Sequence, residues 1–174
     1  MAIRKIVKIG DEVLTKVAKP VTKFDQKLCL LLDDMAETMY EAGGVGLAAP
    51  QIGILRRIFV VDIGDGLIEV INPVVTEKSG EEIDIEGCLS IPNRIGLVSR
   101  PTKITIEAVD RNGNPITLEA EDFLARAFCH EFDHLQGILY LDIMERELSY
   151  EEIQELNKSS NEKEDNVTEK EDNE

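Results

Sequence analysis

The sequence predicts an α+β fold, in which mainly antiparallel β-sheets surround a central helix that carries an HExxH motif. It also predicts an N-terminal helical region and a C-terminal helix. Three observations lead to this prediction. Residues 25–42 place apolar side chains at helical spacing, residues 57–120 hold short β-branched runs between turn residues, and residues 122–137 return to helical spacing. The order helix, strands, helix favours antiparallel sheets packed around the second helix.

The N-terminal region is expected to contain two helices. Residues 11–18 predict a short one that starts near Asp11. Residues 25–42 predict a longer one, for which Asp25 is a suitable N-cap and the glycines at 43–44 form the end. Its apolar positions are Leu28, Leu31, Leu32, Met35, Met39 and Tyr40.

The middle of the chain is expected to be β-rich. Turn residues separate the runs at 64–66, 78–81 and 111–114. Asn112-Gly113 is typical of a two-residue hairpin and should join the last two strands. The predicted strands are residues 57–63, 67–75, 95–100, 103–110 and 115–120.

The second long helix is predicted over residues 122–137, with Gly137 at the position that follows its C-cap. Ser149 is expected to cap a short further helix, with acidic residues in its first turn. From about Lys158 almost no apolar residue remains, so disorder is expected there. We therefore divide the chain into one main domain, residues 1–148, which would carry any activity, and residues 149–174, a short helix followed by an acidic tail.

Charge and composition exclude several classes of function. The chain of 174 residues has a formal net charge of −16, and residues 151–174 carry ten Asp or Glu and three Lys, a net of −7. The remaining −9 lies on residues 1–150, and an acidic body repels phosphates. Direct DNA binding is therefore not expected.

The chain also shows no sign of a membrane or secreted protein. No run approaches about 18 apolar residues, and the first ten residues do not form a secretory signal. The three cysteines, Cys29, Cys88 and Cys129, are scattered and odd in number, which suits a reducing compartment. We expect a cytoplasmic protein, in which Cys29 fills a core position.

Residues 129–137, CHEFDHLQG, contain the only two histidines of the chain, His130 and His134. On a helix they share one face, one turn apart, so both can reach one metal ion. Glu131 lies about 100° round the helix from His130 and can act on a water molecule bound to that metal. The pattern predicts a metal site with its own base, although two hydrogen-bonded core histidines would fit it too.

A third ligand is needed for a catalytic site. A metzincin protease would have histidine where this chain has Tyr140, and a downstream glutamate, as in thermolysin-like enzymes, has no convincing helix to carry it. Cys88 is the better candidate, because two histidines, one thiolate and a water molecule make an open tetrahedral site. Cys129 is its rival, but its side chain points away from the ligand face, so it is expected to pack in the core.

Three motifs together resemble those of the peptide deformylases: GVGLAAPQIG beginning at Gly44, EGCLS at 86–90 and HEFDH at 130–134. They stand in that family's order and spacing, and the similarity runs from about Ile6 to Glu147. The resemblance implies removal of the formyl group from the N-terminal formyl-methionine of newly synthesised polypeptides, with release of formate. It also implies one divalent metal ion, physiologically Fe²⁺, although Zn²⁺, Ni²⁺ or Co²⁺ can occupy such sites.

The resemblance further assigns roles to residues of this chain. Cys88, His130 and His134 would hold the metal, and Glu131 would be general base and then general acid. The side-chain amide of Gln51 and the backbone N–H of Leu89 would bind the developing oxyanion. The remaining candidates would bind substrate: Gly44, Val45, Gly46, Gly87, Phe123 and Ala127.

Several of these roles have an alternative. Glycines 44 and 46 suit a peptide that adds as a strand, or an ordinary loop after a helix. Val45, Phe123 and Ala127 could line a methionine pocket or belong to the core. Asp133 could orient a histidine or lie on a solvated helix face. The rival functions are a metallopeptidase and a non-catalytic metal-binding protein, and the acidic tail argues against anchoring on ribosomal RNA even if the protein works near the ribosome.

Overall fold

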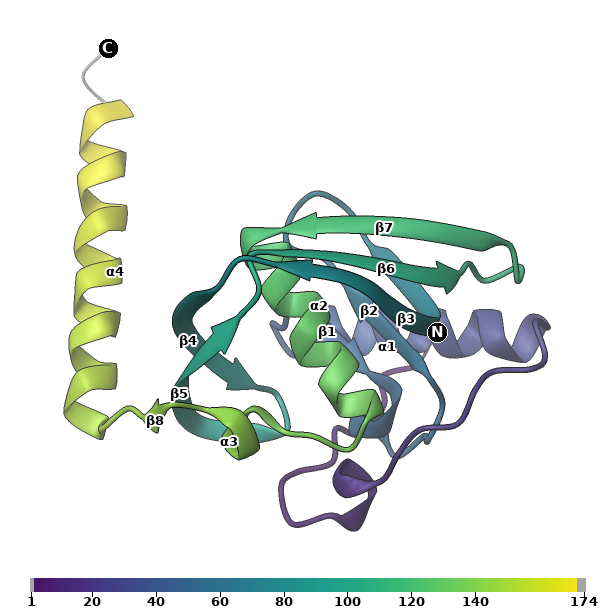
Figure 1. Cartoon of the computed structure of the whole chain (residues 1–174). Coiled ribbons are helices and arrows are strands. Elements are labelled where there is room, and N and C mark those ends of the chain that lie inside the picture. The colour runs from purple at the N-terminus through teal and green to yellow at the C-terminus, as the bar shows by residue number, and fades with distance from the viewer. Residues whose placement is uncertain (1, 172–174) are drawn as a thin grey trace.

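The computed structural model describes residues 2–171, and the side chains of residues 2–160. It has the predicted α+β architecture, with helix α2 (Asp122–Leu135) between two antiparallel sheets (Figure 1). Buried side chains of α2, among them Phe128, pack on strand residues such as Phe59 at a ring-centroid distance of 5.8 Å. The helix that carries HExxH is therefore part of the core and holds its histidines in fixed positions.

The five predicted strands are all present, within a five-stranded and a three-stranded sheet. The first sheet has the order β1 (Gly46–Ala48), β2 (Ile58–Val61), β3 (Ile68–Ser79), β6 (Lys103–Val109) and β7 (Pro115–Glu121). The second has the order β4 (Glu82–Cys88), β5 (Ile91–Arg100) and β8 (Arg146–Glu147).

Three strands were not predicted. The two short ones, β1 and β8, have too few residues to show an alternating pattern. Most residues of β4 are acidic or glycine, which strands generally disfavour. It forms because it pairs with β5 from Glu82 opposite Arg100 to Cys88 opposite Ile91. Cys88 is the last residue of β4.

The N-terminal helices differ in how well they match the prediction. Instead of a helix over 11–18, there is a single 3-10 turn, η1 (Glu12–Thr15), which Asp11 caps by accepting from the N–H of Val13. The chain then becomes extended, and Ala18 N–H donates to Leu135 O at the end of α2. Helix α1 (Gln26–Glu41) begins as predicted, because the Asp25 carboxylate accepts from the N–H of Leu28.

The end of α2 matches the prediction at Gly137. Its φ of +73° is left-handed, and a Cβ there would lie 2.6 Å from the backbone oxygen of Thr15. Cys129 is buried in the core, as expected for a packing residue.

The C-terminal region contains α3 (Tyr140–Ile143) and α4 (Tyr150–Glu171). Ser149 caps α4 as predicted: its hydroxyl accepts from the N–H of Glu152, whose carboxylate accepts from the N–H of Ser149. The helix is longer than the short one expected, since it continues past Lys158. The side chains of residues 161–171 and the whole of 172–174 lie outside the described part. In the part of the chain that is described, no helix is long and apolar enough to cross a membrane.

Candidate metal centre

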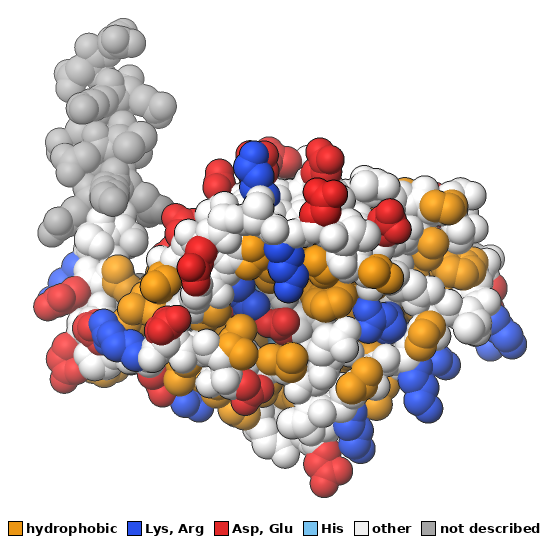
Figure 2. Space-filling model, in the orientation of Figure 1, with side chains coloured by type: hydrophobic (Ala, Val, Ile, Leu, Met, Phe, Trp, Pro, Cys, Tyr) orange, Lys and Arg blue, Asp and Glu red, His pale blue; other side chains and the backbone are white. Residues whose placement is uncertain are grey.

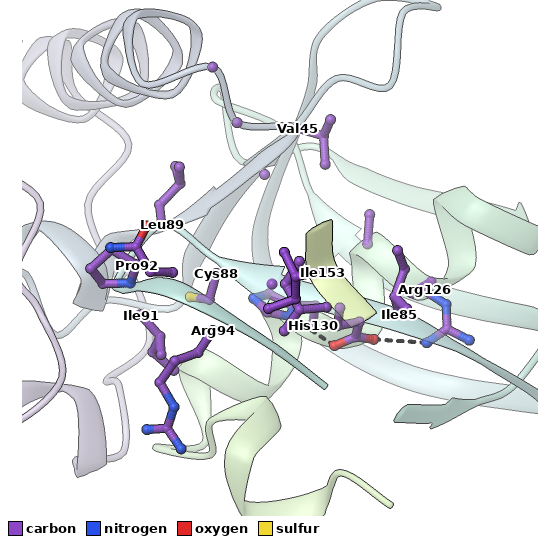
Figure 3. A pocket seen from close by; sticks show the side chains of 18 of the residues that line it. Val45, Ile85, Cys88, Leu89, Ile91, Pro92, Arg94, Arg126, His130 and Ile153 are labelled. Carbon is purple, nitrogen blue, oxygen red and sulfur yellow. Dashed lines mark hydrogen bonds and ion pairs between the residues drawn. The ribbon is translucent and has the colours of Figure 1, made fainter. Parts of the chain in front are cut away.

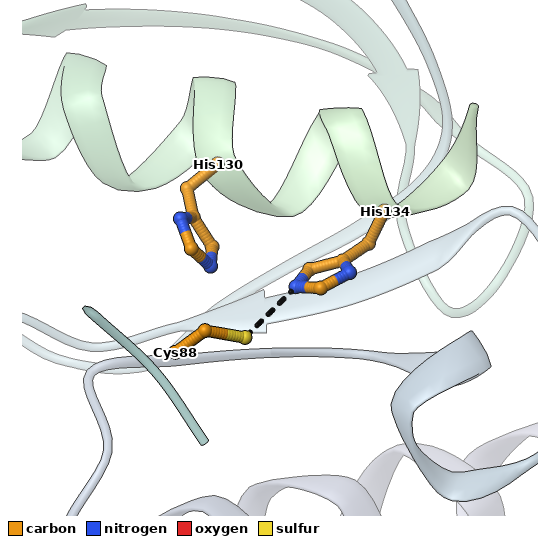
Figure 4. A group of neighbouring side chains, drawn as sticks. All are labelled: Cys88, His130 and His134. Atoms are coloured by element: carbon orange, nitrogen blue, oxygen red, sulfur yellow. Dashed lines mark hydrogen bonds between the residues drawn. The ribbon is translucent and has the colours of Figure 1, made fainter. Parts of the chain in front are cut away.

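Three potential ligands converge below helix α2. His130 and His134 project from consecutive turns, with ring centroids 5.1 Å apart, and Cys88 approaches from the end of β4 (Figure 4). Sγ of Cys88 lies 3.4 Å from Nε2 of His134, and the three ligand atoms all lie within 4.8 Å of one another. The structure thus brings together the three residues that the sequence singled out.

Cys129, the rival ligand, and Tyr140, at the position of the metzincin histidine, do not belong to this cluster. Cys129 is buried among apolar residues on another side of α2, where burial raises the pKa of its thiol to about 11. Tyr140 stacks near His130, but its hydroxyl donates to the backbone oxygen of Arg94 at 2.9 Å.

A buried carboxylate that sequence reasoning missed stands behind His130. Oε2 of Glu86 lies 3.0 Å from Nδ1 of His130, which leaves Nε2 of the imidazole to face the other ligands. Glu86 precedes Cys88 by two residues on the same strand, and both side chains are less exposed than Gly87 between them, although the pairing with β5 shifts register at this point. That alternation was the available signal, but β4 itself was not predicted.

Two arginines hold this carboxylate in place. Arg100 donates to both oxygens of Glu86, at 2.7 and 3.0 Å, and to Asp133 at 2.6 Å. Arg126 donates to Glu86 at 3.1 Å and to the backbone oxygen of Val98 at 2.8 Å. Asp133 therefore neither contacts a histidine nor lies on a solvated face: it binds the arginine that orients the partner of His130.

The pKa values follow from burial and from these contacts. Burial would raise the pKa of Glu86, but hydrogen bonds from His130 and Arg100 hold it at about 2, so Glu86 is anionic. Burial lowers the pKa of His134 well below its usual value and favours the neutral imidazole. For His130, burial is outweighed by contacts with Cys88 and Glu86, which raise its pKa well above the usual range. The centre thus favours a positive charge, which a metal ion can supply in place of a proton.

Glu131 lies beside this cluster and lines the same cavity. Its side chain is buried, burial raises its pKa to about 7, and no hydrogen-bond partner of Oε2 is found among the described residues. A Cβ at Gly46 would lie 2.9 Å from the carboxyl carbon of Glu131 and still closer to Oε1. Gly46 therefore makes room for this carboxylate.

Gln51 is held so that its amide nitrogen faces the cluster. It lies in the 3-10 helix η2 (Ala49–Ile52), and its Oε1 accepts from the N–H of Ala48 at 2.9 Å. Its Nε2 lies 3.2 Å from Oγ of Ser90 and 3.4 Å from Sγ of Cys88. The orientation of the amide is thus set by the backbone of β1, and its donor end points at the candidate ligands.

A cavity of about 700 Å³ opens over these groups. Figure 3 shows Cys88, Leu89 and His130 around it, together with Ile153 of α4. On the face drawn in Figure 2, hydrophobic side chains form a band across the body, with acidic and basic side chains among and around them. All six candidate substrate residues line the cavity: Gly44, Val45, Gly46, Gly87, Phe123 and Ala127.

The alternative assignment to the core is settled for two of these residues. Val45 is 42% exposed and Phe123 53% exposed, so neither is a core residue. Ala127 is buried and packs in the main cluster while it also forms part of the cavity wall. Gly44 differs from a simple loop glycine, because a Cβ there would lie 2.6 Å from Cδ1 of Leu89.

The donor set suits one divalent metal ion. One sulfur and two imidazole nitrogens favour zinc-like or iron-like ions, and in the described part of the chain the cluster has three ligands rather than four. Nδ1 of His134 is buried and has no hydrogen-bond partner among the described residues. Oε2 of Glu131, for which the described residues likewise provide no hydrogen-bond partner, could accept from a water molecule at the fourth ligand position of such a metal ion.

Comparison with known proteins identifies the family. The sequence matches the family profile described as polypeptide deformylase over residues 3–149. The chain belongs to the peptide deformylase family. The peptide deformylase of Caldicellulosiruptor bescii is 57% identical over 155 residues, which cover 89% of this chain and 93% of that protein.

Solved peptide deformylases share the fold. The crystal structure from Thermotoga maritima has a TM-score of 0.82 at 44% identity and covers 84% of this chain and 100% of that one. A structure from Synechococcus elongatus in complex with actinonin has a TM-score of 0.80 at 40% identity, covering 82% and 79%. The predicted family and fold are thereby confirmed.

Proposed function

We propose that this deformylase hydrolyses the N-formyl group of formyl-methionine at the start of newly synthesised polypeptides and releases formate. The observation that carries the proposal is the position of Glu131, a buried carboxylate beside three ligand atoms at the floor of a cavity. Cys88, His130 and His134 would hold the metal ion. When bound, that ion would lower the pKa of a water molecule and polarise the formyl carbonyl.

Glu131 would act first as base and then as acid. Its pKa of about 7 lets it accept a proton from the attacking water and return it near neutral pH. The proton would go to the nitrogen of methionine as the bond to the formyl carbon breaks. The products are formate and a free amino terminus.

Gln51 and the backbone N–H of Leu89 would bind the oxygen that becomes negative during attack. The contact with Ala48 keeps the amide of Gln51 from turning, so its donor is in place before the reaction. A preorganised donor of this kind is typically worth about 3 kcal/mol in the transition state.

The substrate peptide would add as a strand along Gly44, Val45 and Gly46. Strand β1 is at the edge of its sheet, and Val45 O accepts from Asp62 N–H toward β2. Because successive residues of a strand point their backbone groups to opposite sides, those of Gly46 face away from β2. The methionine side chain would contact Val45, Phe123 and Ala127, while Gly87 would lie across the cavity.

We propose Fe²⁺ as the native metal, with Zn²⁺, Ni²⁺ or Co²⁺ as possible replacements, because the donor set suits all four. The thiolate of Cys88 and Fe²⁺ are both open to oxidation, so activity should be sensitive to oxygen. The reaction would take place in the cytoplasm, where new polypeptides emerge, and near the ribosome without anchoring on its RNA.

The test is release of formate from a formyl-Met peptide by metal-loaded protein prepared anaerobically, with Glu131→Gln as the variant. We expect full-length protein to release formate and the variant to lose nearly all activity while it still binds metal. Cleavage of internal bonds in unformylated peptides would instead indicate a metallopeptidase. Metal binding with no hydrolysis of either substrate would indicate a non-catalytic protein.

A further inference from the structure

The start of helix α4 forms a wall of the same cavity that holds the metal centre. Four of its residues line this cavity, namely Tyr150, Ile153, Gln154 and Asn157. Their spacing of three, four and seven residues places them along one side of the helix, which we call the groove face. Figure 3 draws Ile153 among the residues around the cavity.

The groove face has no charge, although α4 is acidic. Within residues 150–160, the charged side chains are those of Glu151, Glu152, Glu155 and Lys158, and none of them lines the cavity. The groove face has one aromatic, one aliphatic and two carboxamide side chains. Carboxamides both donate and accept hydrogen bonds, as the backbone of a peptide requires.

Contacts at its first turn hold α4 in this orientation. Ser149 and Glu152 cap each other's backbone N–H groups, at 3.2 and 2.7 Å. Arg146 is the first residue of β8, and its guanidinium also donates to both carboxylate oxygens of Glu152, at 2.7 and 2.9 Å. Because Arg146 belongs to β8 of the three-stranded sheet, this ion pair connects the start of α4 to that sheet, whose strands β4 and β5 also contribute residues to the cavity lining.

The cavity is larger than the reacting residue needs. It extends from Gly46 and His130 to Asn157 of α4 without interruption, and its volume of about 700 Å³ is in the upper part of the range for ligand sites. If formyl-methionine lies at the metal centre, the residues that follow it in the polypeptide are the chain segment that can reach α4.

We propose that the groove face of α4 binds the residues downstream of formyl-methionine, through its carboxamides and apolar side chains and with little dependence on their sequence. This inference rests on the proposed function. It assigns α4 a part in substrate binding and predicts that longer formylated peptides are better substrates than short ones because they reach the helix.

The first experiment compares formyl-Met-Ala with a formylated hexapeptide of neutral residues, using full-length metal-loaded protein and the double variant Gln154→Ala/Asn157→Ala. We expect the ratio of kcat/KM, hexapeptide over dipeptide, to fall by about three- to tenfold in the variant, since each lost hydrogen bond contributes about 1 kcal/mol or less. The control is Glu151→Ala, off the groove face, which should leave the ratio unchanged.

A second experiment introduces a charge. Ile153→Asp should favour a hexapeptide with lysine at positions four to six over one with glutamate there, by about two- to fivefold relative to the unmodified protein. The control is Lys158→Gln, which also makes α4 more negative by one charge. Because Lys158 is not on the groove face, this variant should not shift the preference between the two peptides.

The two proposals fail in different ways. If neither peptide is deformylated, the proposed function is wrong. If the dipeptide is deformylated, the metal centre and fold are intact, and an unchanged ratio in the first experiment together with no charge preference in the second would overturn the role of α4.

Discussion

Oε2 of Glu86 lies 3.0 Å from Nδ1 of His130, while the same carboxylate accepts hydrogen bonds from Arg100 and Arg126. This contact connects a metal-ligand candidate on α2 to strand β4, which also carries Cys88. The geometry of the candidate centre thus depends on a buried charge network as well as on the three ligands. Removing the charge at its middle should affect both metal binding and folding.

Glu86→Gln is the first variant we would make. The amide keeps the size of the side chain but loses the negative charge, which leaves Arg100 and Arg126 only partly compensated. We expect metal affinity to fall by about 10- to 100-fold and the free energy of unfolding to fall by about 3–5 kcal/mol. Metal titration and urea unfolding measure the two effects, with the exposed Glu82→Gln on the same strand as control. Unchanged metal affinity would show that the contact does not position His130.

Gly46→Ala should disturb catalysis without loss of metal. A Cβ at this position would meet the carboxylate of Glu131, which is buried and has little room to move. We expect kcat to fall by about 100-fold, with metal content unchanged.

Gly44→Ala is a matched comparison for that variant. Its Cβ would meet the flexible end of the Leu89 side chain, so the loss should be smaller. Equal losses in the two variants would contradict a specific effect on Glu131.

Cys88→Ser should abolish tight metal binding, because a hydroxyl is a far weaker ligand than a thiolate for zinc-like and iron-like ions. Cys29→Ser, on α1, should bind metal like the unmodified protein. Metal content after dialysis is the measurement. Full retention of metal by Cys88→Ser would return Cys129 to consideration as the third ligand.

The elements that local sequence specifies were the ones that could be predicted. Asp25, Gly137 and Ser149 act within a few residues of their own position, and His130 and His134 share a helix. Pairing across the fold could not be predicted: β4 is a strand because β5 lies beside it, so Glu86 was missed. The extended segment after η1 likewise depends on a distant contact, the hydrogen bond from Ala18 to Leu135. Gln51 was assigned a role from the resemblance of motifs, because periodicity alone does not single it out.

Gln51→Glu tests the proposed oxyanion donor. The carboxylate can still accept from the N–H of Ala48, so η2 should remain folded, but no amide donor remains. We expect kcat for a formyl-Met peptide to fall by about 10²- to 10³-fold. Gln26→Glu, at the exposed start of α1, adds the same charge and should have no effect. A Gln51→Glu variant with normal kcat would exclude the donor role.

Asp34 should make stability depend on pH. Its carboxylate accepts from the N–H of Ala2 at 2.7 Å and from Nε of Arg4 at 2.8 Å, and these contacts lower its pKa below the usual 3.8. A lowered folded-state pKa means that the stabilisation is complete above the unfolded-state value and is lost as the pH falls below it. We expect Asp34→Asn to reduce the free energy of unfolding by about 1 kcal/mol at pH 7 and by progressively less below pH 3.8. Urea unfolding of the variant and the unmodified protein, at pH 7 and at one pH below 3.8, measures this loss of stability. The control is Asp65→Asn, in an exposed turn. An equal loss at both pH values would show that the charge of Asp34 does not hold the N-terminal segment on α1.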